Sequence, residues 1–142
     1  MLRIFKTIDD VTGEIDEMED GAWIYMVSPT PEEIETVRLR YNVDESHMNA
    51  ALDEEESPRV EVEDESTLFI IDVPVPQEDP SGRLYGTIPI GIIIAKEAII
   101  SICTKDVKIL TDLIKGRMKG FYTYKKTRII LQIMYKVATY FL

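Results

Sequence analysis

The sequence contains one cysteine, Cys103, and one histidine, His47, among its 142 residues. One cysteine excludes an internal disulfide, and two such residues are too few for a zinc site of the usual Cys and His type within one chain. A hydrolytic triad would depend on His47 as its base, so catalysis of that type is not expected. We expect Cys103, in the apolar run IISIC, to be a small buried residue, and His47 to lie at the surface or half buried.

Long hydrophobic runs are also missing. No stretch approaches the roughly 18 uninterrupted apolar residues that a membrane-spanning helix requires. The N-terminus lacks the short apolar core of a signal peptide. An apolar content of 45% is nevertheless too high for a disordered chain, and 142 residues suit one ordinary domain. We therefore expect one folded core without a membrane span.

Basic residues are scarce in the first part of the chain. Residues 1–80 hold 23 acidic and 5 basic side chains, a net charge of −18, whereas residues 81–142 hold 3 and 11, a net charge of +8. Such an acidic segment repels phosphate, so nucleic acid is not an expected partner. Neither GxGxxG nor a P-loop lysine is present, so nucleotides are not expected partners either. The opposite charges can be satisfied within the fold, between subunits or by an external partner.

Apolar alternation and β-branched content predict six strands. They are Leu2–Ile8, Trp23–Val27, Arg59–Glu63, Thr67–Val73, Leu84–Ile94 and Ala98–Thr104. Asp9, Asp10 and Gly13 predict a turn after the first, residues 74–83 a loop, and Lys96-Glu97 the turn of a hairpin.

Four helices are predicted from their start signals and apolar spacing. The first begins at Pro31, with Thr30 as N-cap and Glu33 as its capping-box partner. The others are residues 44 to about 52, residues 107–115 behind an Asp106 cap, and residues 125–142. Strands and helices mixed in this order indicate an α/β fold, with a mixed β-sheet sandwiched by helices.

The terminal helix, Lys125–Leu142, has no glycine, asparagine or proline to end it. Ile130, Met134, Val137 and Phe141 recur at spacings of four, three and four, which predicts one apolar stripe. We therefore expect a helix that continues in a longer protein, and divide the chain into a domain of residues 1–124 and the start of a stalk at 125–142. In this chain the stripe should be partly exposed, packed against the sheet, or buried in a non-native contact.

An acidic run is the one group of residues suited to metal chemistry. The candidate ligands are Asp53, Glu54, Glu55, Glu56 and Glu61. Mg²⁺ prefers oxygen ligands and often binds through one or two carboxylates while keeping several waters. No EF-hand spacing is present, and Glu61 and Glu63 share one strand face, so a solvated acidic rim is the alternative.

Four segments, taken in order, resemble the cytosolic N-terminal domain of the CorA-like family of magnesium and cobalt transporters. They cover about residues 20–142 and read WIYMVSPTPEEIETV, ALDEEESPRVEVEDESTLFIIDVP, TIPIGIIIAKEAIISICTK and ILQIMYKVATYFL. The resemblance rests on a Trp-containing strand that leads to a proline and a Glu-Glu helix, and on a Leu-Asp stretch that leads to a Pro-Arg-hydrophobic-Glu strand.

The resemblance implies that the full-length protein is a homopentamer of identical subunits packed as a funnel, with this domain on the cytoplasmic side of the cell membrane. This chain by itself is expected to be a monomer or to assemble differently. A long stalk and two membrane helices would follow, so this chain would meet the membrane only through segments outside it. The implied function is a non-enzymatic scaffold and regulatory domain that couples the intracellular cation level to pore gating. It requires no cofactor, and Mg²⁺ or another divalent cation is its candidate regulatory ligand.

The sequence departs from the family at the regulatory site. The acidic position on the short helix falls at Ala50, with Asn49 beside it, and Ser57 replaces the basic residue before the proline. The sensing site has therefore moved to residues 53–56, or regulation differs, or sensing is lost. The zinc-transporting branch of the family, an acidic interaction module without ion sensing and a free-standing metal-dependent α/β enzyme are the alternatives.

Overall fold

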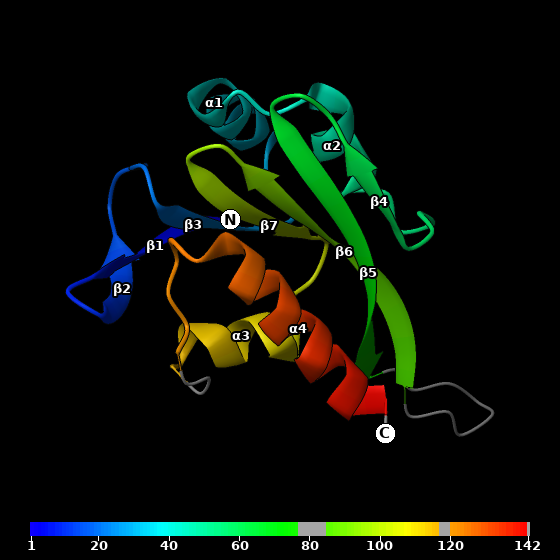
Figure 1. The fold of residues 1–142 in the computed structure, drawn as a ribbon. Helices are drawn as coiled ribbons and strands as arrows, with labels where there is room; N and C mark the ends of the chain where they lie inside the picture. The colour runs from blue at the N-terminus through cyan, green and yellow to red at the C-terminus, as the bar shows by residue number, and fades with distance from the viewer. Residues whose placement is uncertain (77–84, 117–119, 142) are drawn as a thin grey trace.

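A seven-stranded mixed sheet forms the centre of the computed structural model, which describes residues 1–76, 85–116 and 120–141 (Figure 1). The strand order is β2-β1-β3-β7-β6-β5-β4. The strands are β1 (Leu2–Ile8), β2 (Val11–Ile15), β3 (Ala22–Val27), β4 (Arg59–Val62), β5 (Ser66–Pro76), β6 (Tyr85–Ala95) and β7 (Ala98–Cys103). β3 and β7 pair in parallel and the other neighbours antiparallel, so the predicted mixed sheet is confirmed.

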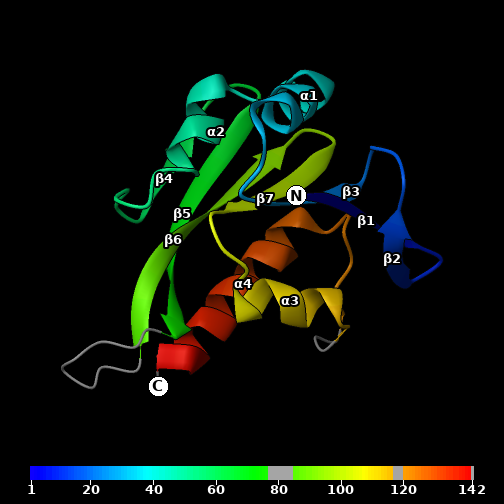
Figure 2. The same cartoon turned by 180° about the vertical axis from the view of Figure 1, so that it is seen from behind.

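Helices cover both faces of this sheet. α1 (Pro31–Tyr41) and α2 (Glu45–Ala50) lie on one face, and α3 (Lys108–Ile114) and α4 (Lys126–Phe141) on the other (Figures 1 and 2). β3 shows why the sheet can be covered twice: Trp23 and Tyr25 point into the core under α3 and α4, and Ile24 and Met26 into the core under α1 and α2. This alternation has the period of two that a strand imposes.

The start of α1 follows the sequence prediction. The Thr30 hydroxyl accepts a bond of 3.1 Å from the N–H of Glu33, and the Glu33 carboxylate accepts one of 2.9 Å from the N–H of Thr30. Both halves of the capping box are therefore formed. α1 ends at Asn42, which adopts the left-handed conformation with φ 54°.

Strand β2 was not predicted, because its sequence, VTGEI, has few apolar residues. The turn before it consists of Asp9 and Asp10, whose φ values of 51° and 63° allow the tight connection that joins β1 to β2. Gly13 was expected in this turn and instead pairs with Lys6 inside the strand. An edge strand needs little apolar surface, which explains the missing signal.

Strand β5 continues beyond its predicted end at Val73 to Pro76, so residues 74–76 of the expected loop are strand. β4 pairs with β5 only as far as Ile70, so among the described residues β5 pairs with β6 alone from Ile71 onward. Prolines are tolerated in such a segment, because an N–H on its unpaired side has no partner strand. The rest of the expected loop, residues 77–83, and the strand start at Leu84 lie outside the described residues.

Two helix predictions were wrong in detail. Asp106 does not cap α3: the N-cap residue is Val107, and the Asp106 carboxylate accepts a bond of 2.7 Å from the Tyr25 hydroxyl. In α2, the helix ends at Ala50 rather than near Leu52.

The buried face of α4 is offset from the predicted apolar stripe. Of the stripe residues, Ile130 and Val137 are buried, together with Ile129 and Ile133 outside the stripe, and the helix packs against the sheet and α3. Met134 and Phe141 are 49% and 55% exposed, so the stripe is partly exposed and partly packed, as predicted. Among the described residues no helix is long and apolar enough to cross a membrane. The division of the chain at residues 124 and 125 stays a prediction.

Candidate functional site

A cleft of about 460 Å³ opens between α2, the turns that follow it and the edge strand β4. Its lining residues are Ser46, Asn49, Ala50, Asp53, Glu56, Arg59 and Glu61. Three of the five predicted cation ligands, Asp53, Glu56 and Glu61, therefore line one cleft. Ala50 and Asn49, where the resemblance led us to expect an acidic residue, line the same cleft.

Consecutive turns fold the acidic run at the end of α2. The N–H of Asp53 bonds to the carbonyl of Ala50 at 3.2 Å, and the N–H of Glu56 to the carbonyl of Asp53 at 3.2 Å. The Asp53 carboxylate also accepts a bond of 2.9 Å from the N–H of Glu55. Short polar side chains stabilise such turns by bonding to the backbone two residues on. The turns bring Asp53 and Glu56 to the wall of the cleft.

Arg59 supplies a positive charge inside this acidic group. Its Nε donates a bond of 2.8 Å to Glu61, and its Nη1 pairs with Glu56. The bonds to Glu61 and then Glu56 raise the pKa of the guanidinium, which therefore stays charged. Two of the three acids in the cleft are thus partly neutralised by the chain itself.

The structure directs the other two predicted ligands elsewhere. Glu54 accepts a bond of 2.6 Å from the hydroxyl of Thr104, which follows β7. Glu55 is exposed and does not line the cleft. Across residues 1–76, 85–116 and 120–141, no group of three or more His, Cys, Asp or Glu side chains is arranged to hold a metal ion. The oxygen donors suit Mg²⁺, but one copy of the chain presents too few of them together.

His47 was expected at the surface or half buried, and this prediction was wrong: the residue is 0% exposed. His47 belongs to α2, and its side chain lies between that helix and the β4–β5 hairpin. Its Nδ1 is 2.8 Å from the Ser66 hydroxyl. Its Nε2 is buried, has no hydrogen-bond partner in the part of the chain that the structure describes, and lies 3.7 Å from Glu61. The sequence signal that could have indicated burial is Ala51, four residues later on the same side of the helix and also buried.

Glu61, His47 and Ser66 include the residue types of a hydrolytic triad, but their geometry does not support catalysis. The distance of 3.7 Å between Glu61 and His47 Nε2 is beyond hydrogen-bond range. Ser66 is 4% exposed, which leaves its hydroxyl no room to reach a substrate. Cys103 is buried as predicted, and burial raises the pKa of its thiol to about 12, so it is not a nucleophile either.

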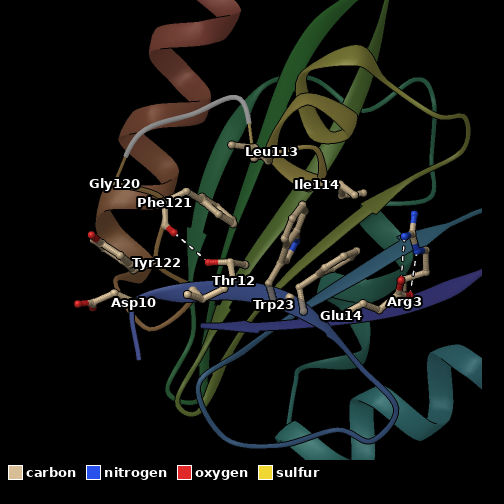
Figure 3. Close-up of a pocket in the computed structure, with 14 residues that line it drawn as sticks. Arg3, Asp10, Thr12, Glu14, Trp23, Leu113, Ile114, Gly120, Phe121 and Tyr122 are labelled. Carbon is tan, nitrogen blue, oxygen red and sulfur yellow. Dashed lines mark hydrogen bonds and ion pairs between the residues drawn. The ribbon is translucent and has the colours of Figure 1, made fainter. Parts of the chain in front are cut away.

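A second hollow, of about 530 Å³, lies between the β1–β2 hairpin and the region after α3 (Figure 3). Trp23 and Phe121 are directed into it. Three of the polar side chains that line this hollow form hydrogen bonds within the protein. Arg3 donates bonds of 3.0 and 2.9 Å to the Glu14 carboxylate, and the Thr12 hydroxyl donates one of 3.1 Å to the carbonyl of Phe121. These bonds tie β2 to β1 and to the segment before α4, which is a structural role.

Comparison with known proteins identifies the family. A family model described as "CorA-like Mg2+ transporter protein" matches residues 3–142. The "Cobalt/magnesium transport protein CorA" of Methanocaldococcus jannaschii is 28% identical over 110 residues, which make up 78% of this chain and 32% of that protein. The chain therefore spans about a third of the length of this curated relative.

Solved structures show the same fold. The soluble domain of CorA from Methanocaldococcus jannaschii has a TM-score of 0.78 at 21% identity, over 98% of this chain and 56% of that one. The ZntB cytoplasmic domain from Vibrio parahaemolyticus has a TM-score of 0.73 at 13% identity, over 95% of this chain and 56% of that one. At such low identity these likenesses establish the fold alone. The resemblance seen in the four sequence segments is confirmed by the match along residues 3–142, and the chain belongs to the CorA-like Mg²⁺ transporter family.

Proposed function

We propose that this chain is the cation-responsive domain of a divalent-cation transporter, a non-catalytic scaffold that couples the intracellular cation level to the pore. The observation that carries the proposal is the match of the family model to residues 3–142. The proposal places the chain on the cytoplasmic side of the membrane, with the membrane contact in segments outside it. Mg²⁺ and Co²⁺ are the proposed ions, as in the name of the archaeal relative.

The proposed cation site lies at the acidic cleft and takes ligands from two copies of the chain. One copy offers Asp53, with Glu56 and Glu61 already paired to Arg59. Glu54 and Glu55 add negative charge beside the cleft. Two such surfaces repel each other when they meet, and a cation between them relieves the repulsion. The assembly that holds the cation is then favoured over the one that does not.

The exposed side of α4 supports assembly into the proposed homopentamer. Leu131 and Tyr135 are 63% and 71% exposed, and Met134 and Phe141 lie near 50%. Large apolar side chains on one helix are typical of a surface that contacts another protein. In the proposed mechanism, a falling cation level releases the contact between copies and biases the pore toward opening.

The zinc-transporting branch is the alternative for the transported ion. The fold likenesses to the ZntB cytoplasmic domain and to CorA leave the choice of ion open, because both concern the fold alone. Ion preference therefore has to come from binding measurements.

Thermal unfolding with and without Mg²⁺ tests the proposal. A ligand that binds the native state raises its stability by about 1.4 kcal/mol at ten times its Kd. We expect the melting temperature to rise between ~1 and ~30 mM Mg²⁺ at constant ionic strength, which excludes a general salt effect. Asp53→Asn should melt higher without Mg²⁺, because repulsion is relieved, and should respond less to the ion.

Glu17→Gln is the matched control, since Glu17 is an exposed acid at the opposite edge of the sheet. It should respond to Mg²⁺ as the unmodified chain does. An unchanged melting temperature at roughly 30 mM Mg²⁺ would refute binding at this cleft, because native-state binding must raise stability by mass action.

A further inference from the structure

The buried histidine behind the acidic cleft has an arrangement that the proposed Mg²⁺ site does not use. His47 is 0% exposed, and its Nε2 has no hydrogen-bond partner among the described residues. A buried polar atom without a partner is costly and calls for an explanation such as a bound ion. The carboxylate oxygen Oε2 of Glu61 lies 3.7 Å from this Nε2 atom.

The separation of these two atoms is that of two ligands of one metal ion. It is too long for a hydrogen bond. Bonds from zinc to imidazole nitrogen measure about 2.0–2.1 Å and to carboxylate oxygen about 2.0–2.2 Å, and such bonds span 3.7 Å at an angle of about 120–135°. The separation therefore corresponds to a tetrahedral ion whose angle at these two ligands is widened.

We propose that His47 Nε2 and Glu61 Oε2 are the two protein ligands of a transition-metal site for Zn²⁺ or Co²⁺, with water from the cleft completing the coordination. Imidazole nitrogen suits these ions, whereas Mg²⁺ takes oxygen. The site thus differs from the proposed Mg²⁺ site in its ligand type and in lying within one copy of the chain.

Both ligands are held by a second group, as metal ligands usually are. When the Nδ1–H of His47 donates to the hydroxyl of Ser66, 2.8 Å away, the free lone pair is on Nε2, the ring nitrogen that lies 3.7 Å from Glu61. The Nε of Arg59 bonds to Oε1 of Glu61 at 2.8 Å and leaves Oε2 toward the histidine. Ser66 and Arg59 are therefore positioning residues for the proposed site.

The cleft gives the ion a route. The side chain of Glu61 is 38% exposed and lines the cleft together with Asp53 and Glu56, so it forms the boundary between solvent and His47. Acidic walls raise the local concentration of cations. An ion reaches Nε2 once the Glu61 side chain turns within the cleft.

NMR of the unmodified chain with Co²⁺ tests the proposal, because His47 is the only histidine. The protein is prepared without a polyhistidine tag. Binding of paramagnetic Co²⁺ should shift the ring signals of His47 far outside their usual range, including an exchangeable N–H signal that disappears in D₂O. Mg²⁺ at the same concentration should leave the ring signals in place. Saturable Co²⁺ binding with unshifted His47 signals would overturn the proposal, and so would the absence of binding.

Three variants test one ligand, one positioning residue and a control. His47→Asn keeps a polar group near Ser66 and removes Nε2, and should weaken Co²⁺ binding at least ~10-fold by titration calorimetry; Ser66→Ala should weaken it ~10- to 100-fold. Glu63→Gln, an exposed acid in the same hairpin, is the control and should bind as the unmodified chain does. Equal affinity in His47→Asn would also overturn the proposal. If that variant does not fold, the NMR result on the unmodified chain decides.

The inference rests on the proposed function only in taking divalent metals as the ions that the chain meets. The two can fail separately. A Mg²⁺-dependent rise in melting temperature without a Co²⁺ shift at His47 refutes this site and leaves the proposed function standing. A Co²⁺ shift at His47 without any response to Mg²⁺ refutes the proposed function and leaves this site standing.

Discussion

Replacing Gly91 with alanine should destabilise the fold by forcing α2 away from the sheet. Gly91 lies in β6, directly beneath the end of α2. A Cβ added there would collide with the Cβ of Ala51 and lie 3.0 Å from its Cα, which is backbone and cannot turn aside. The helix that carries His47 would have to shift.

The expected cost follows from the packing. Overpacking a well-packed core costs about 1–3 kcal/mol, and we expect the upper half of that range because both neighbouring atoms belong to Ala51. Gly13→Ala is the matched control: no atom lies within 4 Å of its added Cβ, and its φ is not positive. Alanine there should be neutral or stabilise by about 0.5–1 kcal/mol, since glycine loses more chain entropy on folding.

Urea unfolding followed by circular dichroism measures both variants. The double variant Gly91→Ala with Ala51→Gly should recover part of the loss, with a coupling free energy of at least ~1 kcal/mol. If Gly91→Ala proves as harmless as Gly13→Ala, α2 does not approach β6 as the structure shows. The placement of His47 against Ser66 would then lose its support as well.

Three further predictions concern other parts of the chain. Thr30→Ala should lower the free energy of unfolding by about 1 kcal/mol in urea titrations, because the capping box at α1 loses one of its two bonds; an unchanged midpoint would contradict the cap. The hydrogen bond from Arg3 lowers the pKa of Glu14, and the one from Arg38 lowers the pKa of Glu35. The stability that these two carboxylates contribute is therefore present above about pH 4.5, their ordinary pKa, and is lost as the pH falls through the lowered pKa. The melting temperature should therefore fall below about pH 4.5, and Glu35→Gln should reduce this dependence; a flat profile from pH 5 to ~2.5 would speak against these pairs. Cys103, buried with its thiol pKa raised to about 12, should react with a thiol reagent only after denaturation, and rapid reaction of the native protein would be inconsistent with its burial.

Much of the fold could be predicted because its signals are local. The capping box depends on residues three positions apart, and the β6–β7 hairpin on two apolar runs around Lys96 and Glu97. β2 escaped prediction because an edge strand packs against little, and its pattern then resembles a loop. The partial exposure of the α4 stripe was predicted, but not which residues it would involve: Met134 and Phe141 are exposed, while Ile129 and Ile133, outside the stripe, are buried.

The cation site stays a prediction, and the arrangement of its residues could not be read from the sequence. The acidic run suggested five ligands, and the structure brings Asp53, Glu56 and Glu61 to one cleft. Glu54 turns away because its partner, Thr104, is 50 residues further along the chain. Contacts of this kind come from the tertiary fold and leave no mark in local spacing. The burial of His47 against the β4–β5 hairpin is of the same kind.

The central claim is that a divalent cation is held between copies of this chain at the acidic cleft. Sedimentation velocity of the chain in Mg²⁺, compared with the same buffer containing a chelator, tests it most directly. The account predicts a species of 16.3 kDa in the chelator and a larger, Mg²⁺-dependent species that Asp53→Asn weakens. A constant mass of 16.3 kDa at every Mg²⁺ concentration would contradict it.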